Sequence, residues 1–423
     1  MSEVVLRRVR PEDVGRQDRP AVTPRALADA TEIVEAVRTA GEAAVRSYAE
    51  RFGERRADEA LVLGRSEMSA ALDAIDSQTR ALLERTAERI RVFAEAQREA
   101  IRPVEIGVPG GKAGHTVEPV SAAGCYAPGG RYPLPSSALM TAVTARAAGC
   151  ERVVVASPGA HPVTVAAAAV AGADEFLCVG GAHGVAALAH GFGAFEPVDV
   201  IAGPGNAWVT AAKQLVSGTV GIDMLAGPSE LLVLADDTAD PDTVAADLLA
   251  QAEHDPEAAA YLVCRSESFA AGVDAALSRR LSGLSTAETA RSGIANGFAC
   301  VCGSLDESLA VTDRVAPEHL EVLIEDAEAV VARVRHAGGV FIGRSAAEVL
   351  GDYGAGPNHT LPTGGTARFR AGLSVIHFLR LRTWLRIDDG VEAAGLVEDA
   401  EALAEIEGLS GHAASARLRR AAD

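Results

Sequence analysis

The sequence predicts an α/β fold built around two doubly wound parallel sheets, with a helical N-terminal region and an extended C-terminal tail. Short apolar runs rich in valine and leucine alternate with helical stretches, and this alternation occurs in two consecutive sets. Continuous apolar strands are typical of parallel sheets whose two faces are both covered by helices. Aromatic residues make up only 4% of the chain, which suits close packing of helices on sheets. The 423 residues are enough for two or three domains, each with its own core.

Two long helical patterns open the chain, over residues 24–52 and 66–97, where apolar residues recur at the three- and four-residue spacing of an amphipathic helix. From Pro103 to Ser137 the sequence becomes rich in glycine and proline, which indicates loops. We therefore expect residues 1–120 to form a helical region that packs on the α/β core.

The first alternating set predicts an incomplete Rossmann-like domain over residues 121–235. Its expected strands are Arg152–Ala156, Glu175–Val179, Val198–Ala202 and Leu231–Ala235. Helical stretches that separate the first of these strands are expected at 163–171, 182–190 and 207–216.

The second alternating set predicts a second Rossmann-like domain over residues 236–380. Its expected strands are Tyr261–Cys264, Phe298–Cys302, Leu320–Ile324 and Val340–Ile342. In both domains we expect ligands at the carboxyl ends of the parallel strands. Residues 381–423 form the tail, which is helical and strongly charged from Val391 onward.

Composition excludes several classes of partner. The net charge of −19 argues against binding to nucleic acid or to an anionic membrane surface. No apolar run approaches the ~20 residues that cross a bilayer. The start, Met1 to Val4, lacks a basic stretch followed by an apolar one, so no signal peptide is expected and the protein is predicted to be cytoplasmic. The six cysteines, mostly in strand-like runs, are expected to be buried, reduced thiols.

Four polar stretches, far apart in the chain, offer metal ligands or acid–base groups at helix ends and glycine-rich turns. They contain Gln251 and His254, Glu318 and His319, Asp352 and His359, and Glu407 and His412. A metal that holds a substrate beside an acid–base pair needs such a mixture of neutral nitrogen and oxygen ligands. Together they indicate one polar site that folding assembles.

Each stretch also has a simpler interpretation. Gln251 and His254 lie three residues apart at the end of a helical stretch, where a histidine can serve only as a cap that the helix dipole stabilises. Glu318 and His319 can form an exposed polar turn, although their ordinary pKa values bracket the range of efficient acid–base catalysis at neutral pH. The loop that holds Asp352 is too glycine-rich for a core element, which favours function.

Two further turns are weak signals by themselves. Gly203-Pro-Gly-Asn206 stands between an expected strand and an expected helix, where phosphates bind at a helix N-terminus. Pro204 and the absence of a third glycine break the usual dinucleotide fingerprint. Ser229 offers a hydroxyl just before the expected strand Leu231–Ala235.

Taken together, these stretches resemble the histidinol dehydrogenase family. The matching phrases are Tyr126-Ala-Pro-Gly-Gly, Gly180-Gly-Ala, Gly203-Pro-Gly-Asn-Ala207, Ile222 to Glu230, Gln251-Ala-Glu-His254, Pro317-Glu-His-Leu320, Gly351-Asp-Tyr, Asn358 to Thr363, Gly364 to Phe369, and the tail around Glu407 and His412. Their order and spacing hold from about Pro24 to the end of the chain. The resemblance therefore covers nearly the whole sequence.

The resemblance implies one zinc ion per subunit and NAD as cofactors. Its zinc ligands fall on Gln251, His254, Asp352 and His412, and nitrogens of the substrate complete the coordination. Its acid–base pair falls on Glu318 and His319. By that resemblance His319 takes the proton of the alcohol as hydride passes to NAD, and Glu318 activates the water that hydrates the resulting aldehyde. A second hydride transfer then gives the acid.

The resemblance also implies the remaining contacts. Substrate contacts fall on Ser229, His319, His359 and Glu407, and the substrate is a small amino alcohol. Cofactor contacts fall on Tyr126, His183 and Asn206. His183 is a departure, because the family usually has glutamine there, and an imidazole differs from an amide in reach and charge.

Domain 121–235 is thus expected to bind the cofactor, and domain 236–380 to carry the metal and acid–base residues. The resemblance implies a homodimer in which the 381–423 tail of one chain completes the partner's site. Two alternatives stay open: a related zinc- and NAD-dependent dehydrogenase of another primary alcohol, such as a sulfonated propanediol, and a catalytically silent binding protein. The second would need loss of the metal or acid–base groups, all of which are present.

Overall fold

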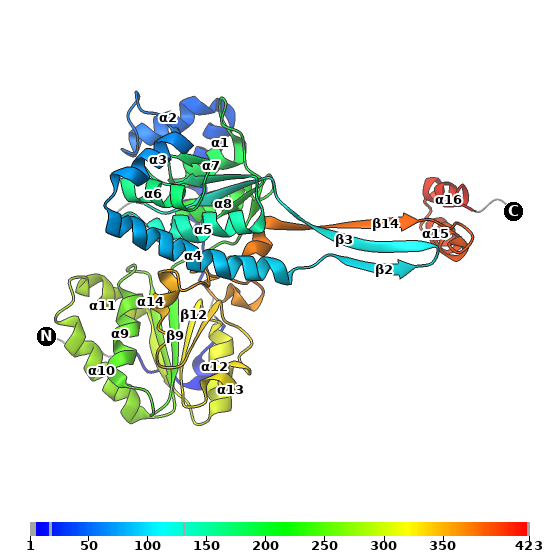
Figure 1. Ribbon diagram of the computed structural model, residues 1–423. Coiled ribbons are helices and arrows are strands. Elements are labelled where there is room, and N and C mark those ends of the chain that lie inside the picture. Colours follow the sequence, from blue (N-terminus) through cyan, green and yellow to red (C-terminus); the bar gives the residue numbers. More distant parts are fainter. Residues whose placement is uncertain (1–5, 17–18, 130–131, 421–423) are drawn as a thin grey trace. The chain divides into compact units, whose positions relative to one another are not determined.

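The computed structural model describes residues 6–16, 19–129 and 132–420. The start of the chain, on which the signal-peptide expectation rests, and two residues of the 126–131 loop lie outside this range. The chain divides into two compact units: the first comprises Met1–Glu95 and Val120–Phe378, and the second Ala96–Pro119 and Leu379–Asp423. Figure 1 shows the helices and strands of each unit.

The first unit contains a six-stranded sheet in the order β1-β6-β5-β4-β7-β8. Its strands are β1 (Val62–Gly64), β4 (Ala122–Tyr126), β5 (Arg152–Ala156), β6 (Glu175–Leu177), β7 (Val200–Ala202) and β8 (Gly221–Ile222). All neighbours are parallel except β1, which runs antiparallel to β6. The expected doubly wound α/β architecture is therefore confirmed for this part of the chain.

Helices cover both faces of this sheet (Figure 1). Four helices pack together in one group: α1 (Pro24–Ala40), α2 (Glu42–Arg51), α7 (Gly181–His190) and α8 (Ala207–Val216). The other group comprises α3 (Arg65–Ala74), α5 (Pro135–Ala148) and α6 (Pro162–Val170). The expected helix over 24–52 is two helices, because Gly41 adopts a φ of 55° that other residues rarely take. The second pattern likewise divides into α3 and α4 (Ser77–Ala100).

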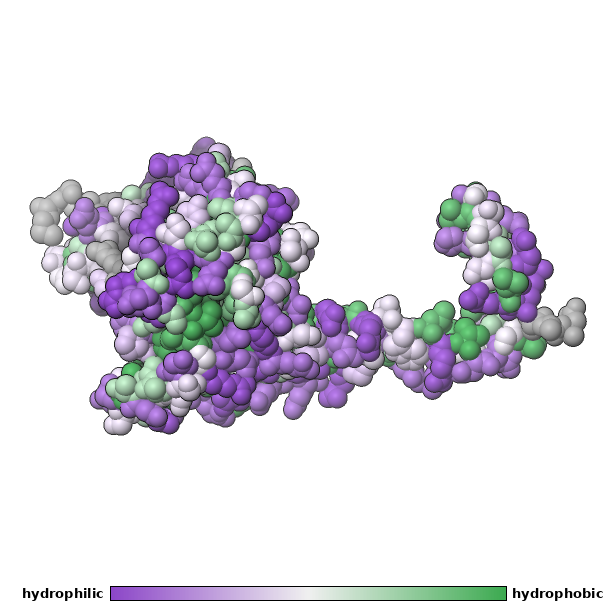
Figure 2. Space-filling model, turned by 90° about the horizontal axis from the view of Figure 1, so that it is seen from above, coloured by the Kyte–Doolittle hydropathy of each residue, from purple (hydrophilic) through white to green (hydrophobic). Residues whose placement is uncertain are grey.

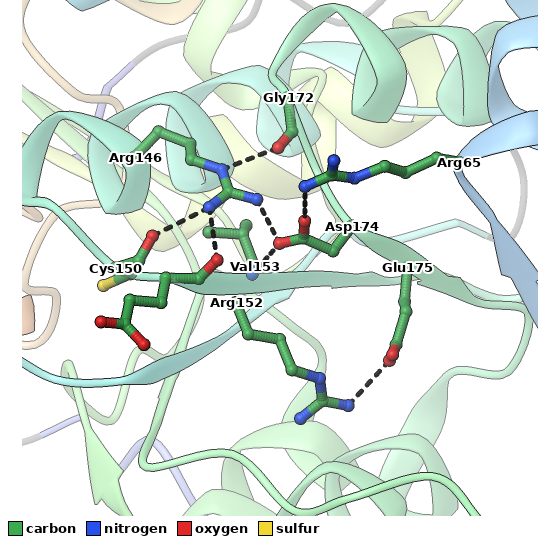
Figure 3. A network of polar contacts seen from close by, with 9 residues as sticks. Arg65, Arg146, Cys150, Arg152, Val153, Gly172, Asp174 and Glu175 are labelled. Atoms are coloured by element: carbon green, nitrogen blue, oxygen red, sulfur yellow. Dashed lines mark hydrogen bonds and ion pairs between the residues drawn. The ribbon is translucent and has the colours of Figure 1, made fainter.

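A polar network fastens helices to this sheet (Figure 3). The Asp174 carboxylate accepts hydrogen bonds from Arg65 on α3, from Arg146 on α5 and from the Val153 backbone N–H, the last at 2.7 Å. Burial alone would raise the pKa of Asp174, but these donors outweigh burial and lower it. The network therefore ties two helices to the strands β5 and β6.

The first unit also contains a five-stranded, fully parallel sheet in the order β11-β10-β9-β12-β13. Its strands are β9 (Glu230–Ala235), β10 (Ala259–Cys264), β11 (Phe298–Val301), β12 (His319–Leu323) and β13 (Gly339–Ile342). Helices α9 (Pro241–Ala252), α10 (Glu267–Leu281) and α11 (Ala287–Asn296) pack together, and α12 (Leu305–Val315) and α13 (Ala327–Val331) contact the strands separately. The short helix α14 (Glu348–Asp352) and the 3-10 turns η1 (Pro11–Asp13), η2 (Thr366–Arg368) and η3 (Val375–Phe378) complete the unit.

Two strand assignments differ from expectation. We expected Leu231–Ala235 to belong to the first domain, yet β9 is the central strand of the second sheet, with β10 and β12 as neighbours. In the first sheet one of the two central strands, β4, lies in the stretch expected to be loop, beside the expected strand β5. Its sequence Ala-Ala-Gly-Cys-Tyr126 lacks the branched residues that mark a buried strand, so it carries no strand signal by composition.

The second unit is a three-stranded antiparallel sheet followed by two helices. Its strands, in the order β14-β3-β2, are β2 (Val104–Val108), β3 (Gly111–Pro119) and β14 (Leu379–Ile387), where loops and a helical tail were expected. The β2–β3 turn uses Gly110 at a φ of 71°, and a Cβ there would lie 2.2 Å from the Asp389 carbonyl oxygen. Helices α15 (Ala394–Ile406) and α16 (Ser410–Arg417) confirm the helical end of the tail.

Buried residues behave as expected for this composition. The six cysteines are free and buried, and the Cys300 and Cys302 sulfurs lie 3.8 Å apart. No helix among the described residues is long and apolar enough to cross a membrane.

Candidate active site

Several of the site residues predicted from the sequence meet at one edge of the second sheet. Ser229 directly precedes β9, and Glu318 directly precedes His319, the first residue of β12. This edge holds the amino ends of the strands, so the expectation of a site at the carboxyl ends is wrong for this sheet. The reason is that a helix connecting two parallel strands runs opposite to them. The C-terminal end of α9, which carries Gln251 and leads to His254, therefore reaches the same edge.

This arrangement has an electrostatic consequence. The C-terminal end of a helix carries partial negative charge from its free carbonyl groups, which favours a cation nearby. In the first sheet the segments Gly180–Gly181 and Gly203–Asn206 follow strands and lead into the N-termini of α7 and α8. Free N–H groups at such ends favour an anion such as a phosphate. The two sheets thus present opposite helix ends, one suited to a cation and the other to a phosphate.

Glu318 is a buried carboxyl group held in one orientation. Its Oε2 accepts a hydrogen bond from the Ser229 hydroxyl at 2.7 Å and from the Glu230 backbone N–H at 2.9 Å. The residue is only 6% exposed. Burial raises the pKa of Glu318 to about 8, which the two hydrogen bonds only partly oppose. A carboxyl group with this pKa can exchange a proton near neutral pH.

His319 lies beside Glu318, and one of its ring nitrogens forms a hydrogen bond. Nδ1 is 3.2 Å from the Glu230 carbonyl oxygen, and a carbonyl can only accept, so Nδ1 carries the proton and donates it. Nε2 then holds the lone pair, and it is buried without a hydrogen-bond partner among the described residues. Burial lowers the pKa of His319 to about 4. The imidazole is therefore neutral at pH 7 and can accept a proton at Nε2.

A second group brings together three residues predicted as metal ligands. His254 Nδ1 donates to the Gln251 carbonyl oxygen at 3.2 Å, which directs Nε2 to within 3.5 Å of Asp352 Oδ2. Two ligand atoms on a tetrahedral zinc, each about 2.1 Å from it, are separated by about 3.4 Å. The Gln251 side chain is fully buried, with its Nε2 unpartnered and its Oε1 3.4 Å from the Ser229 hydroxyl.

The charges of this group agree with a cation site. The hydrogen bond to Asp352 raises the pKa of His254 in spite of burial. For Asp352 burial acts to raise the pKa, but the nearby histidines outweigh it, so the pKa is lowered and the group is a carboxylate. With the His254 ring deprotonated at Nε2, the residues Gln251, His254 and Asp352 offer a neutral oxygen, a neutral nitrogen and an anionic oxygen, which are donors that zinc accepts.

One residue of the site was missed from the sequence. Glu348 is buried on α14, and its Oε1 lies 3.4 Å from His319 Nδ1. Ligand atoms of His319, Glu348 and Asp352 lie within 4.8 Å of one another, so these three residues form a further group able to hold a metal. The available signal was its position four residues before Asp352, which places both on one face of a helix.

A cavity of about 230 Å³ joins these groups to the first sheet. Polar side chains converge on it from segments far apart in the sequence, and they are Ser136, Ser137, Ser229, His254, Glu318, His319, Asp352, His359, Thr360 and Thr363. The predicted substrate residue His359 donates from Nδ1 to the Asp352 carbonyl oxygen at 3.0 Å, and its Nε2 is 3.3 Å from the Ser137 hydroxyl. Burial lowers the pKa of His359.

The three predicted cofactor residues have their side chains in internal contacts at the carboxyl ends of the first sheet. The Tyr126 hydroxyl accepts from the Gly181 N–H at 3.0 Å. Asn206 Oδ1 accepts from two N–H groups of the first turn of α8, each at 3.1 Å. His183 Nε2 lies 2.8 Å from Glu54 Oε2, and its ring lies beside the Tyr48 and Phe52 rings at 5.9 and 5.4 Å.

The last two predicted residues belong to the second unit. Glu407 follows α15 and His412 lies on α16, and both line one hollow of about 660 Å³ between these helices. The α15–α16 hairpin thus brings Glu407 and His412 together.

Comparison with known proteins shows the family of this chain. A sequence profile of a family described as histidinol dehydrogenase matches residues 17–420. The chain belongs to the histidinol dehydrogenase family. A histidinol dehydrogenase of Caulobacter vibrioides is 44% identical over 96% of this chain and 94% of its own length. One of Aromatoleum aromaticum is 43% identical over 92% of this chain and 90% of its own.

The fold agrees with this membership. The crystal structure of histidinol dehydrogenase from Elizabethkingia anophelis superimposes with a TM-score of 0.90 at 28% identity, covering 98% of each chain. The resemblance drawn from the sequence motifs is confirmed, and the chain is an oxidoreductase of the histidinol dehydrogenase family.

Proposed function

We propose that this protein oxidises L-histidinol through L-histidinal to L-histidine with two NAD, the last steps of histidine biosynthesis. The observation that carries the proposal is the buried Glu318–His319 pair, whose free Nε2 lies beside the His254–Asp352 group in one cavity. Membership of the histidinol dehydrogenase family supports the choice of substrate.

Zinc fits the donor set of this site. We propose Gln251, His254 and Asp352 as ligands, together with His412 from the tail. The 3.5 Å separation of His254 Nε2 and Asp352 Oδ2 supports this choice, as does the full burial of the Gln251 side chain, whose Oε1 has only one long contact, 3.4 Å to the Ser229 hydroxyl. Bound zinc would supply a fixed positive charge that orients the imidazole and amino nitrogens of the substrate.

His319 is the base for the alcohol. Because its Nδ1–H is directed to the Glu230 carbonyl, Nε2 is the nitrogen that takes the proton of the substrate hydroxyl. At the same time the carbon that bears this hydroxyl gives up a hydride to NAD. The low pKa of about 4 keeps this nitrogen unprotonated at neutral pH. The aldehyde product then needs a water molecule and a second base.

Glu318 serves that second step. Its carboxylate form would remove a proton from the water that adds to the aldehyde, which gives a hydrate able to lose a second hydride. Ser229 and the Glu230 N–H hold one oxygen of Glu318 in place. Since burial raises the pKa of Glu318 to about 8, only part of the protein has this carboxylate at pH 7.

NAD is proposed to bind at the carboxyl ends of the first sheet, near Tyr126, His183 and Asn206. The N-termini of α7 and α8 at this edge suit its phosphates. Pro204 and Gly205, which precede α8, also line the cavity that holds His319, so a cofactor along this turn can reach the substrate.

We further propose a homodimer in which the tail of one chain supplies Glu407 and His412 to its partner. The second unit exposes large apolar side chains: Val391 is 73% exposed, Ile406 83% and Leu418 85%. Leu381, Leu385 and Ile387 are also exposed at alternate positions of β14, and therefore share one face of the strand. Figure 2 shows hydrophobic side chains on this unit. Contiguous exposed apolar surface usually marks a protein interface.

A substrate comparison tests the proposal. Zinc-loaded protein with NAD should form NADH from L-histidinol and not from simple diols or a sulfonated propanediol, because a site built for polar partners rejects an alcohol that leaves them unpaired. Glu407→Ala should raise the KM for L-histidinol without changing the zinc content. Higher catalytic efficiency with the sulfonated diol would show that the substrate is wrong.

A further inference from the structure

Glu348 is a buried acid without a conventional partner. The residue is 2% exposed, and neither carboxyl oxygen has a hydrogen-bond partner among the described residues. The imidazole of His319 lies beside it, at 3.4 Å from Oε1 to Nδ1. A buried carboxyl group without hydrogen bonds costs stability, so its presence calls for an explanation.

The backbone around Glu348 is held firmly in this position. Its N–H donates to Glu321 Oε1 at 2.6 Å, and Glu321 is fully buried on β12, two residues after His319. Glu321 in turn shares a hydrogen bond with Asp247 on α9. The pair of buried Glu321 and half-buried Asp247 therefore fastens the start of α14 to β12 and α9, and this fixes where the Glu348 side chain lies.

The contact with Nδ1 bears on which nitrogen of His319 is the base. Nδ1–H donates to the Glu230 carbonyl at 3.2 Å, and Glu348 Oε1 lies 3.4 Å from Nδ1 without hydrogen-bond geometry. Both oxygens attract the N–H proton, so they stabilise the tautomer that leaves the lone pair on Nε2. They also hold the ring in place, because a single 3.2 Å hydrogen bond leaves it free to tilt.

We propose that Glu348 is a positioning residue for His319: with the Glu230 carbonyl it keeps the proton on Nδ1 and directs the Nε2 lone pair into the cavity. This rests on the proposed role of His319 as the base. Removing a carboxylate that orients a histidine in this way commonly lowers activity by about 10- to 100-fold or more. The competing role is direct metal ligation with His319 and Asp352.

The test compares Glu348→Ala, Glu348→Gln and a control, Glu328→Ala, at an exposed glutamate on α13. With zinc-loaded dimer, Glu348→Ala should lower kcat for NADH formation from L-histidinol about 10- to 100-fold, with KM changed less than about twofold and zinc content unchanged. Glu348→Gln keeps an acceptor oxygen of the same reach and should recover most of kcat. The control should match the wild type in all three measurements.

A spectroscopic measurement separates this proposal from the proposed function. In protein labelled with ¹⁵N-histidine, the His319 signals, assigned with His319→Ala, should report the Nδ1–H tautomer in the wild type and in Glu348→Gln. They should report a mixture of tautomers in Glu348→Ala. This measurement needs no substrate, so it remains decisive even if the wild type does not oxidise L-histidinol.

Three results would overturn the inference. Loss of zinc from Glu348→Ala would make Glu348 a metal ligand instead. An unchanged kcat and an unchanged tautomer would show that Glu348 does not act on His319. Equal impairment of the Gln and Ala variants would show that an acceptor oxygen at this position is not what His319 needs.

Discussion

The buried Lys213–Asp223 ion pair offers the sharpest test of how the Gly203 turn, where NAD is proposed to bind, is held in place. Asp223 is fully buried and Lys213 is 2% exposed. Beyond its ion pair with Lys213, the Asp223 carboxylate accepts from the Gly203 N–H at 2.8 Å and the Met224 N–H at 2.6 Å. Lys213 Nζ also donates to the Gly203 carbonyl oxygen at 2.9 Å. The pair thus holds both polar backbone groups of Gly203.

Asp223→Asn keeps the size of the side chain but leaves the Lys213 ammonium buried without its counter-charge. Breaking a buried pair in this way costs about 3–5 kcal/mol, because the remaining charge is desolvated and unpaired. Gly203 has a φ of 127°, and a Cβ there would lie 2.1 Å from the Tyr126 carbonyl oxygen, so its position is tightly restricted. Loosening it should displace the turn that leads to Asn206. We therefore expect a higher KM for NAD with little change in the KM for the alcohol.

The measurement is urea unfolding of the zinc-loaded protein, with initial rates in parallel. The matched control is Glu175→Gln in the same sheet, which breaks the Arg152–Glu175 ion pair drawn in Figure 3. Those side chains are 20% and 32% exposed, so water compensates and the cost should stay below about 1 kcal/mol. If Asp223→Asn costs no more than the control, the buried pair does not hold the turn as argued.

Four further predictions concern the chemistry and the assembly. Glu318→Gln should slow the second hydride transfer more than the first in single-turnover counts of NADH; equal slowing would refute the division of labour between Glu318 and His319. In the wild type the second step should accelerate as pH rises through about 8, because burial raises the pKa of Glu318 and the base is its deprotonated form; a rate that falls from pH 6 to 9 would contradict this. Chelation should abolish activity while circular dichroism stays nearly unchanged, since the proposed ligands extend from preformed α/β elements; global unfolding would count against this. Mixed dimers of inactive His319→Ala and inactive His412→Ala chains should regain part of the activity, and no recovery in verified mixed dimers would exclude the exchanged tail.

Local pattern was sufficient for much of the fold. The strand β5 and the helix α8 have the bounds expected from their sequences. The reason is that apolar residues are spaced differently along a buried strand and along an amphipathic helix, so each type of element can be recognised locally. Gln251, His254, Glu318, His319 and Asp352 were also visible beforehand. They stand at helix ends, turns and a strand start, and it was their combination in four separate stretches, rather than any one position, that indicated a common site.

Other features left no local trace. β4 is built from small residues, and β9 resembles any other Val- and Leu-rich run, so neither its sheet nor its neighbours can be read from its own sequence. The strands β3 and β14 pair across more than 250 residues of chain: Leu379, for example, lies opposite Pro119. Which sheet a strand joins depends on its hydrogen bonds to other segments, and those neighbouring strands come together only when the whole chain folds.

The sequence by itself determined the two-sheet α/β class, the family and most of the polar residues gathered at the site, since these follow from spacing and motif. Only the tertiary structure decided that Glu318 and His319 stand at the amino ends of the second sheet, at the same edge as the end of α9. Only it showed that Glu348 lies against His319 and that Asp223 holds Gly203. A buried carboxyl group and its partner meet through packing, and two residues far apart in sequence give no sign of that contact until the surrounding core excludes water from both.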